Sequence, residues 1–238
     1  MNRILFEKEE IKDGLATFGG VRAEHVLNVL HGTVGQRLKT GEVDGPVGCG
    51  EILVIGDDGS VTVRLEHDGE SLPPCVDLIL APPRPRVMKR LLPQLAALGV
   101  GRLVLVGAKK VEKDFWGATL LKEEIYRPLL VDGLMQSGTT ALPRISTVRN
   151  FQKWLKTDLD GEFPSRRRIV AHPYGAEKEP SAATSGAGRL LLAVGPEGGW
   201  TDEEVALLEQ KGFARYSLGP RILRTDTAVV ALLARLCL

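Results

Sequence analysis

Two segments near the carboxyl end of the chain carry residue types suited to binding a ligand. The first is Gly195–Trp200 (GPEGGW), which follows the apolar run Leu190–Val194 and precedes Thr201–Glu204 (TDEE). The apolar run is typical of a buried parallel strand. In TDEE the Thr201 hydroxyl and the Glu204 carboxylate can cap the start of a helix reciprocally. Because glycines permit positive φ and a close approach of the backbone, GPEGGW is predicted to be a ligand-facing turn between strand and helix.

The second segment, Leu218–Thr225 (LGPRILRT), repeats this arrangement. A short strand is expected near Ala214–Leu218, followed by a Gly-Pro turn and by a helix from about Asp226. An open α/β sheet binds its ligand beyond the carboxyl ends of its strands. The two segments are therefore predicted to form one site.

A tight connection without a ligand is the usual explanation of a glycine-rich strand-to-helix turn. Glu197 favours a site, because a carboxylate among glycines packs poorly but accepts hydrogen bonds from an amine, a ribose hydroxyl or a backbone cap. Arg221 and Arg224 in the second segment favour it further. The alternative for either arginine is an ion pair with Glu197 or Asp226.

The composition is that of an ordinary soluble protein. The chain has 238 residues, of which 43% are hydrophobic and 26% are charged, so it is long enough for one large domain or two smaller ones. The formal net charge of +1 provides no general attraction for nucleic acid, and RNA binding would depend on local patches. Cys49, Cys75 and Cys237 are scattered, which predicts free thiols in a reducing cytosol and no metal site.

No segment is predicted to direct the chain to a membrane. The first residues, MNRILFEKEEIKDG, lack the apolar core of a signal peptide. Ala228–Ala234 is apolar but far too short to cross a bilayer. We therefore expect a cytoplasmic protein without a membrane partner.

Residues 1–72 are predicted to be rich in β-structure. Glu51–Ile55 and Val61–Leu65 flank Gly56–Ser60, a loop with the composition of a hairpin turn, and His25–Leu30 reads as a short helix or helical turn. The regular spacing of strands and turns suits a small barrel. A linker of turn composition at Gly69–Pro74 separates this part from residues 73–238.

Residues 73–238 alternate strands and helices in the manner of a parallel sheet. Strands are expected at Val76–Ala81 and Arg102–Val106, with a helix through Leu98 between them. A helical stretch follows at Leu120–Leu134 with a break or kink at Pro128. The start of the first of these helices is basic and either faces solvent or contacts phosphate, with Arg84, Arg86, Lys89 and Arg90.

Several familiar enzyme classes are excluded by missing motifs. The sequence contains no G-x-x-x-x-G-K-[ST] phosphate loop, no G-x-G-x-x-G after the first strand of the second domain, and no G-x-S-x-G elbow. No His/Cys cluster has the spacing of metal ligands.

The pair GPEGGWTDEE and LGPRILRTDTA resembles the signature of the bacterial 16S ribosomal RNA uridine-N3 methyltransferases, S-adenosylmethionine-dependent enzymes of the SPOUT class. The resemblance implies an α/β fold, with a PUA-like RNA-binding β-barrel at 1–72 and a knotted parallel-sheet methyltransferase domain at 73–238. It also implies a C-terminal trefoil knot, a homodimer, and 16S rRNA or the small ribosomal subunit as the substrate.

The resemblance places the S-adenosylmethionine pocket at the ends of three strands. The residues implied for the cofactor are His172, Val194, Gly195, Glu197, Gly198, Gly199, Leu218, Gly219, Ile222, Leu223 and Thr225. For catalysis, an arginine beside the base would stabilise the uracil imide anion. Arg224 is the first candidate for this role and Arg221 the second.

Some positions depart from the family pattern. The Lys109–Gly117 loop lacks the usual Ser/Arg-rich segment, Thr139 replaces an arginine, Met135 replaces an acid, and His31 replaces a basic residue. A SPOUT methyltransferase that acts on a different RNA position is therefore an alternative, and a non-catalytic RNA-binding module is a third. The nearly all-apolar helix Asp226–Leu238 is expected to be buried on several sides, in a monomer core or at a dimer interface.

Overall fold

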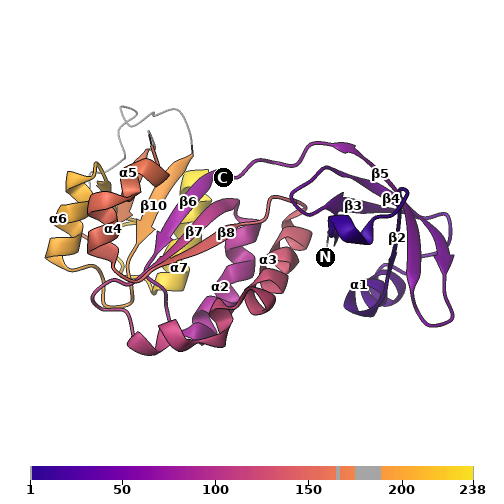
Figure 1. The fold of residues 1–238 in the computed structure, drawn as a ribbon, viewed down its shortest axis with the longest axis horizontal. Helices are drawn as coiled ribbons and strands as arrows, with labels where there is room; N and C mark the ends of the chain where they lie inside the picture. Colours follow the sequence, from indigo (N-terminus) through magenta and orange to yellow (C-terminus); the bar gives the residue numbers. More distant parts are fainter. Residues whose placement is uncertain (1, 165–166, 175–188, 238) are drawn as a thin grey trace. The chain divides into compact units, whose positions relative to one another are not determined.

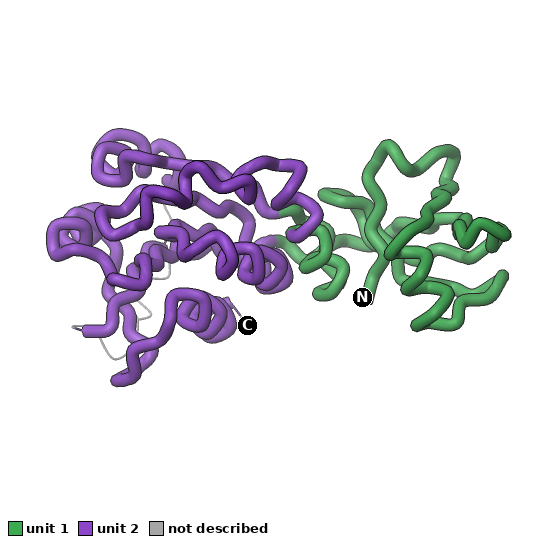
Figure 2. Tube along the Cα trace, turned by 90° about the horizontal axis from the view of Figure 1, so that it is seen from below, with its two compact units in different colours: residues 1–73, 130–142 green, residues 74–129, 143–238 purple. Residues whose placement is uncertain are grey.

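The computed structural model describes residues 2–164, 167–174 and 189–237. The chain forms two compact units, which Figure 2 colours separately. Unit 1 contains residues 1–73 and 130–142, and unit 2 contains residues 74–129 and 143–238. Each unit has its own sheet and its own buried apolar cluster.

Unit 1 is built on a curled five-stranded sheet with the strand order β1-β3-β4-β5-β2 (Figure 1). Its strands are β1 (Ile4–Phe6), β2 (Leu15–Phe18), β3 (Arg37–Glu42), β4 (Val47–Ile55) and β5 (Val61–Gly69). The predicted hairpin at 56–60 is confirmed, since β4 and β5 pair antiparallel on either side of it. The expected short helix consists of α1 (Gly20–Glu24), which continues into a π-helical turn at His25–Val29. A 3₁₀ helix at Lys8–Glu10 completes the regular structure of residues 2–73.

Residues 130–142 group with unit 1 because specific hydrogen bonds hold them there. The Arg3 side chain donates to the carbonyl oxygens of Gly138 (3.0 Å) and Thr40 (2.5 Å). The Thr140 hydroxyl donates to the Gly45 carbonyl at 2.6 Å, and the Leu142 N–H donates to the Asp44 carboxylate at 2.7 Å. These bonds span long distances in sequence, so local sequence patterns do not reveal this grouping.

Unit 2 contains a six-stranded parallel sheet with the strand order β11-β9-β10-β6-β7-β8. Its strands are β6 (Val76–Leu80), β7 (Val100–Val106), β8 (Arg144–Val148), β9 (Arg168–Ala171), β10 (Leu190–Val194) and β11 (Ala214–Tyr216). The strands β6 and β10 are buried along their whole length, as their apolar sequences predict. The strand order changes direction between them, which is where open α/β sheets place ligands.

Helices cover both faces of this sheet (Figure 1). The helices of unit 2 are α2 (Pro85–Ala97), α4 (Phe151–Thr157), α5 (Leu159–Glu162), α6 (Asp202–Gln210) and α7 (Thr225–Cys237), with 3₁₀ helices at Lys113–Gly117 and Thr119–Leu121. The helix α3 (Glu123–Ser137) begins in unit 2 and ends in unit 1. One face packs against α4, α5 and α6 in a single apolar cluster. On the other face α2 packs against α7 and β7.

The sequence predicted a break or a kink at Pro128. A break does not occur, because α3 runs through this residue from Glu123 to Ser137, and the kink stays a prediction. Pro128 lacks the N–H that would donate to the Glu124 carbonyl. Both residues are exposed, so water can hydrate that carbonyl in place of the missing donor. Within the single chain, α7 buries Thr225, Val229, Leu232 and Leu233 and exposes Ala234 and Arg235, so the core of unit 2 covers it only in part. Burial of its other sides at a dimer interface stays a prediction.

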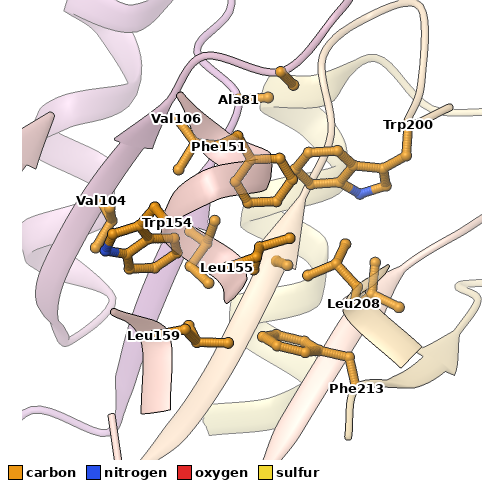
Figure 3. Close-up of a cluster of buried hydrophobic side chains, with 14 of the residues drawn as sticks. Ala81, Val104, Val106, Phe151, Trp154, Leu155, Leu159, Trp200, Leu208 and Phe213 are labelled. Atoms are coloured by element: carbon orange, nitrogen blue, oxygen red, sulfur yellow. The ribbon is translucent and has the colours of Figure 1, made fainter. Parts of the chain in front are cut away.

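The apolar cluster of unit 2 extends from the helices into the first ligand-facing turn. Figure 3 shows Phe151 of α4 lying against Trp200, which ends the GPEGGW segment. The two rings are stacked with their centroids 5.1 Å apart. Trp200 is 6% exposed and Phe151 is 1% exposed. The position of this turn is therefore tied to the packing of the core.

Other expectations concern cysteines and membranes. Cys49, Cys75 and Cys237 are free thiols, as predicted. Among the residues that the structure describes, no helix combines the length and the apolar character needed to cross a membrane.

Candidate active site

Three loops of unit 2 enclose a cavity of about 300 Å³. They follow the carboxyl ends of β9, β10 and β11, as the parallel strand arrangement predicts. Twelve of the thirteen residues predicted for the site line this cavity: His172, Val194, Gly195, Glu197, Gly198, Gly199, Leu218, Gly219, Arg221, Ile222, Leu223 and Thr225. Arg224 is exposed and is not among the lining residues.

The loop after β10 depends on its glycines for different reasons. A β-carbon on Gly195 would lie 3.2 Å from three ring atoms of Trp200, so a side chain here would press on the stacked indole. Gly199 has φ +69°, in the left-handed region that favours glycine, and its N–H donates to the Pro196 carbonyl at 2.8 Å. The result is a tight turn whose backbone faces the cavity without intervening side chains.

The predicted capping box at the start of α6 is confirmed. The Thr201 hydroxyl accepts from the Glu204 N–H at 3.3 Å, and one oxygen of the Glu204 carboxylate accepts from the Thr201 N–H at 2.8 Å. The other oxygen accepts from the Lys109 N–H at 2.8 Å. Glu204 is 1% exposed, so this carboxylate joins the loop after β7 to the loop after β10 from within the core.

The loop after β11 is fixed by two hydroxyl groups. The Ser217 hydroxyl accepts from the Gly219 N–H at 3.1 Å and lies 3.3 Å from the Pro173 carbonyl of the loop after β9. The Thr225 hydroxyl donates to the Gly195 carbonyl at 3.4 Å. Gly219 has φ +117°. These contacts connect all three loops around the cavity.

His172 is positioned by hydrogen bonds to backbone carbonyl groups. The backbone N–H of His172 donates to the Tyr216 carbonyl at 3.0 Å, which extends the pairing of β9 with β11. Its Nδ1 lies 2.6 Å from the Tyr174 carbonyl oxygen. His172 is therefore placed as part of the cavity wall.

The charged residues at the cavity differ in their partners. Asp226 lies 3.8 Å from Arg90. Among the residues that the structure describes, it forms no ion pair with Arg221 or Arg224. Within residues 189–237, Glu197 forms no ion pair with either arginine. Arg84 donates to Glu112 at 2.9 Å, and this hydrogen bond raises the pKa of the Arg84 guanidinium, with a smaller contribution from the nearby Glu197 carboxylate.

The lining suits a ligand that combines a flat polar base with an aliphatic chain. Backbone N–H and C=O groups of the glycine-rich turns can bond the edge of a base, while apolar side chains such as Leu218, Leu223 and Leu232 contact its faces. Glu197 supplies a carboxylate for an amine or a ribose hydroxyl. This combination of bare backbone, apolar side chains and one carboxylate fits S-adenosylmethionine.

The sequence model of the RNA methyltransferase domain family matches residues 70–237. The chain belongs to this family. Within it, the chain is 32% identical over 237 residues to ribosomal RNA small subunit methyltransferase E of Treponema pallidum, covering 97% of this chain and 88% of that protein. The protein of the same name from Bacillus subtilis is 25% identical, with 96% and 93% covered. The chain is thus a member of the small subunit methyltransferase E group of RNA methyltransferases.

Solved structures confirm the SPOUT-type fold expected for such a methyltransferase. The ribosomal RNA small subunit methyltransferase E of Neisseria gonorrhoeae, bound to S-adenosyl methionine, has a TM-score of 0.77. It is 22% identical, and the match covers 99% of this chain and 96% of that one. A Legionella pneumophila protein in complex with the same cofactor has a TM-score of 0.75 at 25% identity, with 99% and 96% covered.

The structure also adds residues to the site that sequence patterns did not single out. Trp200, Ser217 and Tyr174 line the cavity, and Lys110 reaches the loop after β10 from a distant part of the chain. Ser217 has a recognisable signal, because a hydroxyl two residues before a glycine commonly closes a local turn. Lys110 has no such signal, since its partner Gly198 lies 88 positions away.

Replacing Gly195 by alanine tests the contact between the first loop and the core. The added methyl group would lie 3.2 Å from the Trp200 ring, which Phe151 supports from its stacked position. We expect Gly195→Ala to lower the free energy of unfolding by about 1–3 kcal/mol and to shift the tryptophan emission. Denaturant unfolding followed by fluorescence measures both effects.

Gly199→Ala is the matched control for this variant. Nothing lies within 4 Å of a β-carbon on Gly199, so only its positive φ opposes the change, at a cost of about 1 kcal/mol. Its emission spectrum should remain that of the wild type. An unchanged spectrum in Gly195→Ala as well would contradict the proposed coupling between the turn and Trp200.

Proposed function

We propose that this protein transfers a methyl group from S-adenosylmethionine to N3 of a specific uridine in 16S ribosomal RNA. The observation that carries this proposal is the single cavity that the loops after β9, β10 and β11 enclose in a chain of the RNA methyltransferase family. The relatives from Treponema pallidum and Bacillus subtilis bear the name ribosomal RNA small subunit methyltransferase E. The cofactor assignment is supported by neighbouring structures solved with S-adenosyl methionine.

The residues that would hold the cofactor are those that line the cavity. The turns at Gly195–Gly199 and Leu218–Gly219 offer backbone groups to the adenine edge, and Glu197 offers a carboxylate. When bound, S-adenosylmethionine supplies an electrophilic methyl group on a sulfonium. The hydrogen bond from the Thr225 hydroxyl to the Gly195 carbonyl connects the two turns.

The acceptor nitrogen of uracil carries a proton and becomes an imide anion when that proton leaves. A guanidinium beside the base stabilises such an anion with charge-assisted hydrogen bonds. Arg224 is the first candidate and Arg221 the second, because both belong to the loop after β11 and, in the part of the chain that the structure describes, neither forms an ion pair with Glu197 or Asp226. The exposed position of Arg224 outside the cofactor cavity suits contact with a base that approaches from solvent.

RNA binding is assigned to a basic surface at the start of α2. Arg84 is paired with Glu112 and Arg90 lies 3.8 Å from Asp226. Arg86 and Lys89 are exposed and, within the described residues, form no ion pair. Because the chain carries a net charge of only +1, these two side chains are the strongest local candidates in α2 for phosphate contacts.

The remaining parts of the proposal concern organisation. We infer that residues 1–72 act as a PUA-like RNA-binding domain and that residues 73–238 act as the methyltransferase domain with a C-terminal trefoil knot. We also infer a cytoplasmic location and a homodimer. The homodimer is supported by two exposed apolar side chains of the cavity wall, Ile222 (74% exposed) and Leu223 (38% exposed), which a second copy could cover.

Mass mapping of ribosomal RNA from a deletion strain tests the function. We expect 3-methyluridine to disappear from one position of 16S RNA and to return when the gene is restored. Loss of a methyl group from another RNA would support the alternative of a changed target, which the departures at Thr139 and Lys109–Gly117 suggest. An unaltered modification map together with no binding of S-adenosylmethionine would favour the non-catalytic RNA-binding module.

The role of Arg224 is tested by Arg224→Ala. We expect kcat for RNA methylation to fall on the order of 10²–10³-fold, the effect of removing one donor that stabilises a developing anion. The exposed side chain makes little contribution to folding, so the unfolding midpoint should not change. Arg144→Ala, which removes the same charge from the exposed side of β8, serves as the control. Full activity in Arg224→Ala would exclude the assigned role.

The basic surface is tested by comparing Lys89→Ala on α2 with Lys153→Ala on α4. Both lysines are exposed, so the two variants lose the same charge with little change in packing. We expect only Lys89→Ala to weaken RNA binding, and the slope of log K against log salt to become shallower by about 0.7–0.9 for the lost phosphate contact. Equal slopes of log K against log salt in Lys89→Ala and Lys153→Ala would show that the RNA does not contact Lys89 on α2.

A further inference from the structure

The segment after β7 is attached to the cofactor loop at two points. The Lys109 N–H donates to the Glu204 carboxylate at 2.8 Å, and the Lys110 ammonium donates to the Gly198 carbonyl at 2.7 Å. Gly198 lines the cavity, whereas Lys110 does not. Lys110 therefore acts on the cavity only through Gly198.

The aliphatic part of the same side chain covers Gly198 from outside. A β-carbon on Gly198 would lie 3.0 Å from Cδ and 3.5 Å from Cβ of Lys110. Gly198 is thus held by a charged hydrogen bond at its carbonyl and by contact with a methylene chain at its Cα. Both contacts oppose an outward movement of the loop.

The backbone before Lys110 is held by contacts other than the hydrogen bond between Lys110 and Gly198. Glu204 is 1% exposed and accepts from three donors, of which the Lys109 N–H is one. Ala108 is buried in the apolar cluster that includes Trp200. A β-carbon on Gly107 would lie 2.2 Å from the Arg149 carbonyl oxygen, so the chain passes closely beside the end of β8.

We propose that Lys110 is a positioning residue that holds the Gly198 turn in its ligand-binding shape. A loop that is already ordered loses less conformational entropy when a ligand binds, and its affinity is higher for that reason. The inference rests on the proposed function in one respect, since it takes S-adenosylmethionine as the ligand of the cavity. It adds a role for a segment whose sequence departs from the family pattern.

The test compares Lys110→Met with Lys109→Met. Methionine keeps an unbranched apolar side chain over Gly198 but removes the ammonium. At position 109 the same substitution leaves the backbone N–H that bonds Glu204. Isothermal titration calorimetry with S-adenosylmethionine is expected to give about three- to tenfold weaker binding for Lys110→Met and unchanged binding for Lys109→Met.

Kinetics and rescue separate positioning from a general structural effect. In Lys110→Met, KM for S-adenosylmethionine should rise by the same factor as the dissociation constant, while kcat stays within about twofold of the wild type. Lys110→Arg restores a charged donor and should recover most of the affinity. The unfolding midpoint without ligand should be the same in all variants, because the side chain is exposed.

The outcomes distinguish this inference from the proposed function. Wild-type affinity in Lys110→Met would overturn the inference and leave the function intact, as would an equal loss in Lys109→Met. No binding of S-adenosylmethionine by the wild type would instead overturn the proposed cofactor and the inference with it. Weaker binding in Lys110→Met alone, with recovery in Lys110→Arg, supports the positioning role.

Discussion

The arrangement of the site depends on the hydrogen bonds that the buried Glu204 carboxylate accepts. It caps α6 through Thr201 and also binds the Lys109 N–H, so one side chain fixes the loops after β7 and β10. At 1% exposure neither oxygen can exchange a lost partner for water. Leaving a buried donor or acceptor unpaired costs about 1–3 kcal/mol, which is a large part of the stability of a typical domain. The two loops are therefore held in one relative position.

A site made of backbone needs this kind of support. Glycine turns allow a ligand to approach N–H and C=O groups, but they also give the chain more freedom to move. In this protein the freedom is removed from three sides. The Trp200 ring packs against Gly195. The Thr225 hydroxyl donates to the Gly195 carbonyl, and the Lys110 ammonium donates to the Gly198 carbonyl. Lys110 and Thr225 lie outside the Gly195–Trp200 turn, and Trp200 is its last residue. The glycines of the turn therefore remain accessible to a ligand in the cavity.

Local sequence patterns predicted those features that depend on neighbouring residues. The apolar runs gave β6 and β10, the TDEE segment gave the cap of α6, and the 56–60 loop gave the hairpin of unit 1. Strand ends in a parallel sheet meet at one edge, which is why twelve of thirteen predicted site residues share one cavity. Arg224 lies outside that cavity, and its assignment to the RNA base stays a prediction.

Features that depend on distant contacts were beyond these patterns. Lys110 and Gly198 are 88 positions apart, and the sequence around neither residue predicts the hydrogen bond between them. The grouping of residues 130–142 with unit 1 rests on Arg3, Asp44 and Gly45, which precede their partners in that segment by 135, 98 and 95 positions. The predicted break at Pro128 does not occur for a different reason, because the Glu124 carbonyl that lacks its donor is at an exposed position where water can satisfy it.

The same contacts bear on the departure from the family pattern at Thr139. Gly138 accepts from Arg3, and Thr140 donates to Gly45, so the backbone is fixed on both sides of position 139. The Thr139 hydroxyl itself contacts only the nearby Ser137 hydroxyl, at 3.0 Å, among the described residues. The residue at this position can therefore change without altering the path of the chain. An arginine here, as the resemblance implies for relatives, would add a positive charge and a long side chain without requiring a different backbone.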